Sequence, residues 1–534
     1  MAIPRWYPIE QYTRLEERMA KRSRKMRRLF WFLRDHRREL FDNEFQAELE
    51  TMYRNTGAGL PPIAPALIAM AVILQGYVGA SDAEAVELTV MDLRWQMVLE
   101  RLGKTEPALS VGALHAFRQR MIKHDMDRRL LERTVELARK TGDFDAKKLP
   151  KSLRVGIDSA PLEGAGRVED TFNLLGHAAR SVVACVAVIL GWEVERVCRE
   201  AGIPLLLEIS IKKGLDIEWS APEAKAKAMR VLVKQLKSLQ AWVGARLHDD
   251  ARGGPLGEVL DTLRQLIEQD LEPDPDDGGL RIRQGTAPDR RVSVRDSQMR
   301  HGRKSKSRRF NGYKRHIAAD LDAKLILACA ITPANVPEQQ AATPLAQDVE
   351  RQGRSIDELY IDRAYINCEP VDQIRGRGGE VLCKPWVARN ANKGAFTKAE
   401  FGLTMRDMTI TCPAGRHERI QPGTVVEFEP EQWERCPLRP QGTMASAGCG
   451  KTVSIAGDEK EQHRLRKLVA TSKGRARLRL RTGVEHRLAH LVRRQGRRAR
   501  YLGVRKNLFY VRRASAIQNL EAAQRNDKGV RLVA

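Results

Sequence analysis

The chain has 534 residues, which is enough for two to four domains with sizeable cores. Lysine and arginine number 93 against 68 aspartate and glutamate, so the formal net charge is +25. This excess favours a polyanionic partner, nucleic acid first and an anionic membrane surface second. Charge alone names no function, because many basic proteins are only well solvated.

Secreted and membrane-spanning classes are not expected. The N-terminus MAIPRWYPIEQ lacks the apolar segment of a signal peptide. The longest apolar runs, IAPALIAMAVIL and VVACVAVILGW, are too short to cross a bilayer, which takes about 20 residues. A cytoplasmic, peripheral or DNA-bound protein remains. The eight scattered cysteines predict reduced thiols rather than a disulfide framework.

Residues 1–150 are predicted to be helical. The apolar stretch 65–80 is followed by Ser81 and Glu84, the pattern of a capping box at the start of a further helix. Another helix is predicted to start at Ser110, with Arg118 and Arg120 on its polar side. Short helices with basic faces suit DNA binding, so these two arginines are candidate DNA contacts. A helical bundle with solvated charges is the alternative.

The pattern changes after residue 150. A short strand is predicted at Leu153–Ile157, with Asp158 at its end and a glycine-bearing loop after it. A helical stretch, assigned to 176–280, closes with the acidic, Pro/Gly-rich linker 268–281. Strands return as a hairpin turning near 320–323 and as segments within 357–367 and 379–387. Residues 400–463 carry three cysteines, and a last helical block begins near 480. Such an order predicts a mixed α/β sheet interrupted by insertions.

Three acids occupy places that are awkward for acids. Asp158 ends an apolar strand, and Asp362 lies inside LYIDRAYI. Glu485 is the only acid among eighteen Lys or Arg between residues 464 and 513. Carboxylates at the ends of different elements are what a divalent metal site needs. Taken singly, each has a simpler explanation as a turn, cap or helix-dipole residue.

The ordered blocks of this chain resemble the DDE transposases of bacterial insertion sequences. GIDSAPLEGAG is similar to the first catalytic block, YIDRAYIN to the D-x-[AG]-Y block, and RTGVEHRLAHL to the R-x-x-x-E block. The resemblance therefore implies Asp158, Asp362 and Glu485 as catalytic metal ligands, with Arg481 beside them. The pattern departs at Leu478 and Val492, where relatives carry Tyr and Lys.

The family implies a ribonuclease H-like α/β core interrupted by insertions, with an all-α N-terminal domain. We assign 1–150 to the DNA-binding domain and 151–515 to the core, interrupted at 176–280 and 400–463. Residues 516–534 are assigned to a C-terminal tail. The expected cofactor is Mg²⁺ or Mn²⁺, and the expected place is the bacterial nucleoid in the cytoplasm.

The expected activity is cleavage at the terminal inverted repeats of an insertion sequence, followed by joining to target DNA. The partner is double-stranded DNA, bound by a homodimer, with no membrane. Besides Arg118 and Arg120, the basic residues expected to contact DNA are Arg303, Lys304, Lys314, Arg493, Arg494, Arg497 and Arg498. The alternatives are a catalytically inactive or domesticated DNA-binding protein and a nuclease without a joining step.

Structural zinc is not expected. Cys412, Cys436 and Cys449, with His417, could supply ligands in number, but closely spaced ligand pairs are missing. The segment is then an insertion with buried thiols.

Overall fold

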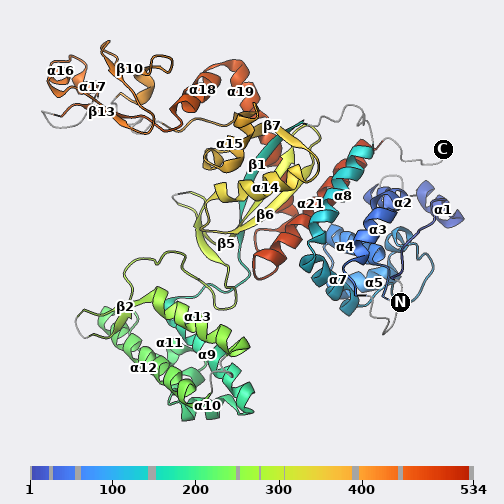
Figure 1. The fold of residues 1–534 in the computed structure, drawn as a ribbon. Helices are drawn as coiled ribbons and strands as arrows, with labels where there is room; N and C mark the ends of the chain where they lie inside the picture. The colour runs from blue at the N-terminus through green and yellow to red at the C-terminus, as the bar shows by residue number, and fades with distance from the viewer. Residues whose placement is uncertain are drawn as a thin grey trace.

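The computed structural model describes residues 3–22, 28–54, 62–141, 152–247, 253–275, 278–305, 307–387, 396–442 and 449–527. A central sheet lies between the N-terminal helices and two insertions, one helical and one rich in short strands (Figure 1). The expectation of a mixed α/β protein with a helical N-terminal region is confirmed at this level.

The described N-terminal region is helical, as predicted. Its helices are α1 (Arg14–Arg22), α2 (Arg28–Leu40), α3 (Asn43–Glu50), α4 (Pro65–Val78), α5 (Asp82–Met91), α6 (Leu93–Val98), α7 (Val111–Lys123) and α8 (Met126–Lys140). Helix α5 starts with the predicted capping box, in which Ser81 and Glu84 satisfy each other's backbone N–H groups. Helix α4 is buried along most of its length because nearly all its residues are apolar.

The main sheet has the order β4-β5-β1-β7-β8, and β6 also pairs with β5. The strands are β1 (Ser152–Glu163), β4 (Arg300–Arg303), β5 (Arg309–Asp320), β6 (Ile326–Pro333), β7 (Ser355–Tyr360) and β8 (Glu380–Leu382). β5 runs antiparallel to β1 and β6, whereas β7 is parallel to β1 and β8. The predicted hairpin is present, with its turn between residues 320 and 326.

Helices pack on both sides of this sheet. α14 (Ala342–Glu350) and α15 (Glu369–Gly376) lie near β6, β7 and β8, and α20 (Thr482–Gln495) packs on β1 and β5. α21 (Val504–Asn526) lies between β6 and the N-terminal helices α8 and α4. Ion pairs fix this contact: Arg512 binds Asp125 at 2.5 Å, and Arg505 also reaches Asp127. The N-terminal helices are therefore joined to the sheet through α21.

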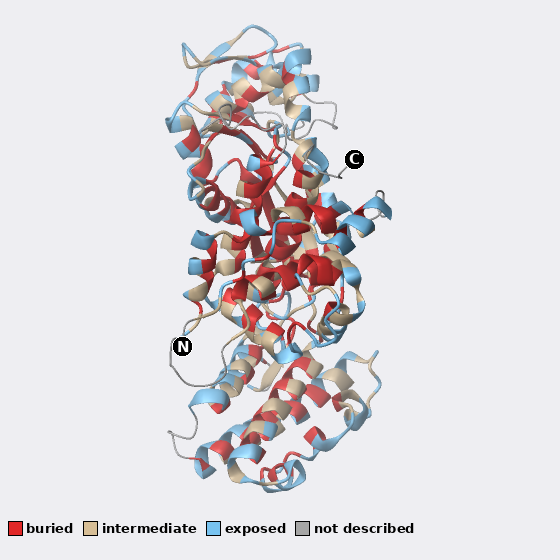
Figure 2. Cartoon of the chain, turned by 90° about the vertical axis from the view of Figure 1, so that its right-hand side faces the viewer, coloured by how far each residue is buried: buried red, intermediate tan, exposed pale blue. Residues whose placement is uncertain are grey.

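The assigned tail from residue 516 is corrected, because α21 continues to Asn526. Ile517, Leu520 and Ala523 are buried in the main core, which also includes side chains of α4 and the sheet. Figure 2 shows this buried centre in red, between two more exposed ends. The C-terminal segment thus belongs to the packed part of the molecule as far as Asn526.

The helical insertion begins at α9 (Thr171–Leu190) and continues through α10 (Val194–Glu200), α11 (Ile211–Leu215), α12 (Pro222–Arg246) and α13 (Gly254–Asp270). It has its own hydrophobic core and forms a separate lobe (Figure 1). The predicted linker 268–281 is partly a hairpin, β2 (Leu271–Pro273) with β3 (Leu280–Ile282). α9 is long and apolar enough to cross a membrane, but half of that window is buried, against neighbours that include α12 and α13.

The cysteine-bearing insertion contains two small sheets. The first joins β9 (Gly402–Thr404), β10 (Thr409–Thr411) and β11 (His417–Arg419), and the second joins β12 (Val425–Phe428) and β13 (Lys451–Ser454). The short helices α16 (Pro430–Glu434) and α17 (Arg439–Gly442) pack with them, and α18 (Glu459–Ala470) and α19 (Ser472–Arg479) lead back to α20. Cys412 and Cys436 are buried in the core of this insertion, whereas Cys449 is exposed.

Candidate active site

Asp158 lies in the middle of a strand, not at its end. β1 continues to Glu163, and Asp158 pairs with Ile317 of β5. The short strand predicted at 153–157 is therefore corrected. β7 pairs with β1 only as far as Gly156, so one edge of β1 is open beside Asp158. This open edge leaves room for other groups next to the carboxylate.

Asp362 is brought to the same level as Asp158 by the parallel register. Gly156 of β1 is the partner of Tyr360 of β7, and the two acids each follow these residues by two positions. Asp362 lies just past the end of β7, where its side chain caps η5 (Arg363–Tyr365) by accepting a 2.7 Å hydrogen bond from the Arg363 amide. The side chain remains exposed and free to accept further bonds.

Glu485 reaches this place because α20 packs very closely on β1. A Cβ on Gly156 would stand 2.8 Å from Cβ of Val484, so only a glycine leaves room for this contact. Val484 precedes Glu485, and Gly156 and Asp158 share one face of the strand since side chains alternate. The first turn of α20 is thereby fixed beside Asp158.

Arg315 fixes the other end of α20. This fully buried guanidinium donates to the carbonyls of Gly496 at 2.9 Å and Pro161 at 3.1 Å. Burial lowers the pKa of Arg315 to about 10. Helix α20 is therefore tied to β1 at both ends. Arg315 could not be recognised as a structural residue from the sequence, because nothing in its local pattern indicates that it is buried.

The predicted acids line one pocket. This open pocket of about 790 Å³ is lined by Asp158, Asp362, Arg481 and Glu485, together with basic and apolar side chains. Arg481, just before α20, donates to Asp158 at 3.4 Å and to Glu485 at 2.5 Å. A guanidinium thus lies between two of the three carboxylates.

A fourth carboxylate, Glu338, also lines the pocket and was not identified from the sequence. It lies in η4 (Glu338–Ala341), between β6 and α14. The pKa of Asp158 is raised, mainly by burial, while Arg481 lowers it and the negative charges of Glu485 and Glu338 raise it. The acids are thus close enough for their negative charges to repel one another.

Tyr365 is a buried neighbour of the pocket residues Glu338 and Asp158. It is fully buried, and its hydroxyl lies 2.9 Å from Nδ1 of His316, whose Nε2 lies 2.9 Å from the Thr332 hydroxyl. The pKa of Tyr365 is raised well above its usual value, first by burial and then by the charges of Glu338 and Asp158. His316 is fully buried, so it cannot contact a phosphate in this structure.

The donor chemistry fits a divalent metal. Carboxylate oxygens are the ligands of Mg²⁺ and Mn²⁺, and four carboxylate side chains line this pocket: Asp158, Glu338, Asp362 and Glu485. In the described part of the chain, however, no three acidic, histidine or cysteine side chains are close enough to hold one ion. Arg481 now provides the positive charge between Asp158 and Glu485.

The basic residues expected to contact DNA fall into different places. Arg303, Lys304, Lys314, Arg493 and Arg497 line the pocket of the acids. Arg498 lines a neighbouring pocket with Arg167, Arg295, Arg309 and Arg500. Arg494 binds Glu521 at 2.6 Å and faces a third pocket.

Arg118 is corrected as a DNA contact. Its side chain is buried and forms a two-pronged ion pair with Asp82 of α5, so it cannot reach a phosphate without breaking that pair. Arg120 is half-buried and stacks over the ring of Tyr53, with 4.5 Å between the guanidinium carbon and the ring centroid. Both arginines thus make packing contacts within the helical region, and DNA contact by Arg120 stays a prediction.

Comparison with known proteins agrees with this arrangement. Residues 286–520 match the family model described as a transposase DDE domain. No curated protein and no solved structure matches the chain. The matched segment contains Asp362, Arg481 and Glu485, while Asp158 lies before it. The resemblance to the DDE transposases is confirmed by this match, which covers residues 286–520 of the chain.

Proposed function

We propose that the protein is the transposase of a bacterial insertion sequence, binding the terminal inverted repeats, cutting at the element ends and joining them to target DNA. One observation carries the proposal: Asp158, Asp362, Arg481 and Glu485, far apart in the sequence, line a single pocket with exposed basic residues at its rim. The strand order β6-β5-β1-β7-β8, with β5 antiparallel, supports a ribonuclease H-like core.

Asp158, Asp362 and Glu485 would hold Mg²⁺ or Mn²⁺. When bound, such ions supply positive charge and a polarised oxygen nucleophile for phosphoryl transfer. The pocket lining also contains basic and apolar side chains, which would orient the DNA. In cleavage, a water oxygen forms a bond to phosphorus and the P–O3′ bond breaks, leaving a 3′-hydroxyl. In joining, that hydroxyl attacks a target phosphodiester and displaces the target's own 3′ oxygen.

Arg481 would act on the scissile phosphate. In the DNA-free protein its guanidinium pairs with Asp158 and Glu485. A phosphate entering the pocket offers oxygens that a guanidinium binds in a forked, bidentate way. Arg303, Lys304 and Arg497 at the rim neutralise neighbouring phosphates, so DNA binding should weaken steeply with salt.

Residues 1–150 would recognise the DNA. Residues 151–515, together with the rest of α21, would carry out catalysis. Two element ends must be brought together for joining, so we propose a homodimer on DNA. Localisation with the bacterial nucleoid would follow from the substrate.

The test uses purified full-length protein with duplexes carrying the DNA that flanks its gene. With Mg²⁺ the wild type should nick or cut at the boundary of an inverted repeat and give strand-transfer products. Asp158→Asn, Asp362→Asn and Glu485→Gln should bind the duplex and not cut. Asp372→Asn is the matched control, because this exposed aspartate of α15 lies outside the pocket lining.

Binding without cutting by the wild type in Mg²⁺ and in Mn²⁺ would favour the second candidate, an inactive DNA-binding protein. Cutting without strand transfer would favour a nuclease. Full activity in any of the three acid variants would remove that residue from the site.

A further inference from the structure

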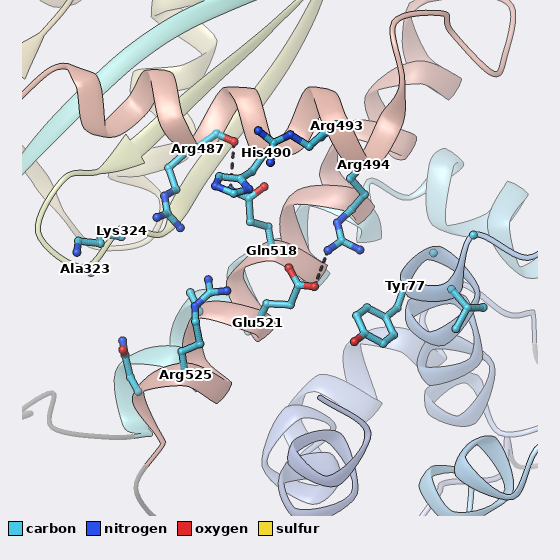
Figure 3. Close-up of a pocket in the computed structure, with 15 residues that line it drawn as sticks. Tyr77, Ala323, Lys324, Arg487, His490, Arg493, Arg494, Gln518, Glu521 and Arg525 are labelled. Carbon is cyan, nitrogen blue, oxygen red and sulfur yellow. Dashed lines mark hydrogen bonds and ion pairs between the residues drawn. The ribbon is translucent and has the colours of Figure 1, made fainter. Parts of the chain in front are cut away.

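A second basic pocket lies on the other side of α20. Its volume is about 740 Å³, and it is enclosed by α20, α21, the end of α4 and the turn between β5 and β6. In Figure 3, Arg487 from α20 and Arg525 from α21 extend into the space between the two helices. Lys324 approaches from the β5–β6 turn, and Tyr77 lies on the opposite side.

The charge of this pocket is mostly uncompensated. Among the described residues that line it, Glu521 is the only acid, and Glu521 is already bound to Arg494. Among the described residues, no ion pair is formed by Lys324, Arg487, Arg493 or Arg525. A surface that served only solubility would intersperse acids with these bases, whereas this one gathers cations.

The basic groups here repel one another. Burial lowers the pKa of Arg487, and the charge of Arg525 lowers it further. The pKa of His490 is lowered in the same way, by burial and then by Arg487, Arg493 and Arg525. Folding therefore holds like charges together at a cost, and a bound anion would remove that cost.

The backbone conformation of Lys324 is a second indication that positive charge is important in this pocket. Its backbone is in the left-handed region, with φ at 59°, where glycine would be unstrained. A residue with a Cβ is strained in this region. The turn nevertheless carries an exposed lysine that lines the pocket.

The spacing of the bases suits a chain of phosphates. Arg487, His490 and Arg493 are three residues apart on α20, so they follow one face of the helix over about 9 Å. Duplex DNA carries one negative charge for about every 1.7 Å of its axis, so several phosphates lie within that distance. Arg493 also lines the pocket of the acids, so the two basic surfaces meet at one residue.

We infer that this second pocket binds the phosphodiester backbone of double-stranded DNA outside the catalytic pocket. The inference rests on the proposed function, since it assigns a further site to the same substrate class. The DNA is either a distant part of the molecule being cut or a second duplex. Helix α20 then carries Glu485 on one side and a DNA anchor on the other.

The test compares three forms of the full-length protein on a fluorescent duplex of arbitrary sequence. Arg487→Gln/Arg525→Gln removes two charges from the pocket, and Lys234→Gln/Lys237→Gln removes two exposed charges from α12 in the distant helical lobe. The measured quantity is the slope of log affinity against log salt. Each lost phosphate contact flattens this slope by about 0.9, so the pocket variant should be flatter by about 1.8 and the control unchanged.

A charge-keeping variant, Arg487→Lys/Arg525→Lys, separates charge from folding, because it should retain most of the slope. Stoichiometry measured by sedimentation then distinguishes the two DNA sources. If the Gln variant forms a weaker complex with unchanged stoichiometry, the pocket binds a distant part of the same DNA molecule. If the Gln variant loses only the second bound duplex, the pocket binds a separate DNA molecule.

Equal slope and stoichiometry in the wild type and the Gln variant would overturn the inference and leave the proposed function standing. A second outcome would overturn the inference in favour of an acidic protein partner. In that outcome poly-glutamate binds the wild type but not the Gln variant, while both forms bind DNA equally. A wild type that binds no duplex at all would instead overturn the proposed function.

Discussion

Val484 of α20 lies directly on Gly156 of β1, closer than any other residue type at position 156 would allow. A Cβ at 156 would meet Cβ and Cγ1 of Val484 at 2.8 Å and Cδ2 of Leu321 at 3.0 Å. This contact sets the distance between the strand that carries Asp158 and the helix that carries Glu485. The geometry of the site therefore depends on the absence of one methyl group.

We predict that Gly156→Ala displaces α20 from β1. Overpacking of this kind costs about 1–3 kcal/mol in the free energy of unfolding. DNA cleavage should fall much further than stability, because Glu485 moves away from Asp158. Chemical denaturation and a cleavage assay measure the two effects. Gly376→Ala on α15 is the control, since nothing lies within 4 Å of a Cβ at that position. Normal cleavage by Gly156→Ala would show that the close contact is not needed.

Under the proposed function, Arg481 would compete with metal for the carboxylates of Asp158 and Glu485 in the DNA-free protein. We predict that Arg481→Gln binds Mn²⁺ more tightly in the absence of DNA, by about fivefold if the lost pairing contributes about 1 kcal/mol. Electron paramagnetic resonance of free Mn²⁺ measures this without any activity assay. Arg477→Gln is the matched control, because Arg477 pairs with Glu380 and Glu358 outside the pocket. Weaker or unchanged Mn²⁺ binding in Arg481→Gln would contradict the competition.

The elements around the site were predictable to different degrees. The β5–β6 hairpin follows from a long apolar alternation broken by a polar turn, and both features are local. The end of β1 was predicted too early because Pro161 and Gly164 are typical of loops. In the structure β7 has already left β1 at Gly156, so Pro161 has no neighbour on that edge and its missing N–H costs no sheet hydrogen bond.

The site itself was predictable only where a motif marks it. Asp158, Asp362 and Glu485 are recognised from family blocks, and their common pocket arises from the sheet register and the α20 contact. Glu338 belongs to no such block and reaches the pocket only through the turn after β6. Arg118 shows the opposite error: a polar position on a helix can face a partner acid on another helix instead of solvent.

The Arg118–Asp82 pair should matter for stability and not for DNA affinity. We predict that Arg118→Gln lowers the free energy of unfolding by about 2 kcal/mol, less than a fully buried pair because Asp82 is partly exposed. Asp82→Asn and the double variant complete a cycle whose coupling energy isolates the pair. DNA affinity at low temperature, where every variant remains folded, should be unchanged. A loss of affinity with intact stability would restore Arg118 as a DNA contact.

His316 should make stability depend on pH in one direction. It is fully buried between Tyr365 and Thr332, and burial lowers its pKa from 6.5 to about 3. Above pH 6.5 His316 is neutral in both the folded and the unfolded chain, so it does not change stability there. Below pH 6.5 the unfolded chain binds a proton at His316 and the folded chain does not. His316 lowers stability progressively as pH falls from 6.5 towards 3, at up to about 1.4 kcal/mol per pH unit.

We predict that His316→Gln loses less stability than the wild type between pH 6.5 and 3. The slopes of unfolding free energy against pH should differ by up to about 1.4 kcal/mol per pH unit, which corresponds to one proton. Chemical denaturation at a series of pH values measures it. His417→Gln, at an exposed position of β11, should keep the wild-type slope. Parallel curves for the wild type and His316→Gln would mean that His316 is protonated in the folded protein, and its hydrogen bonds to the two hydroxyls would then be those of an imidazolium donor.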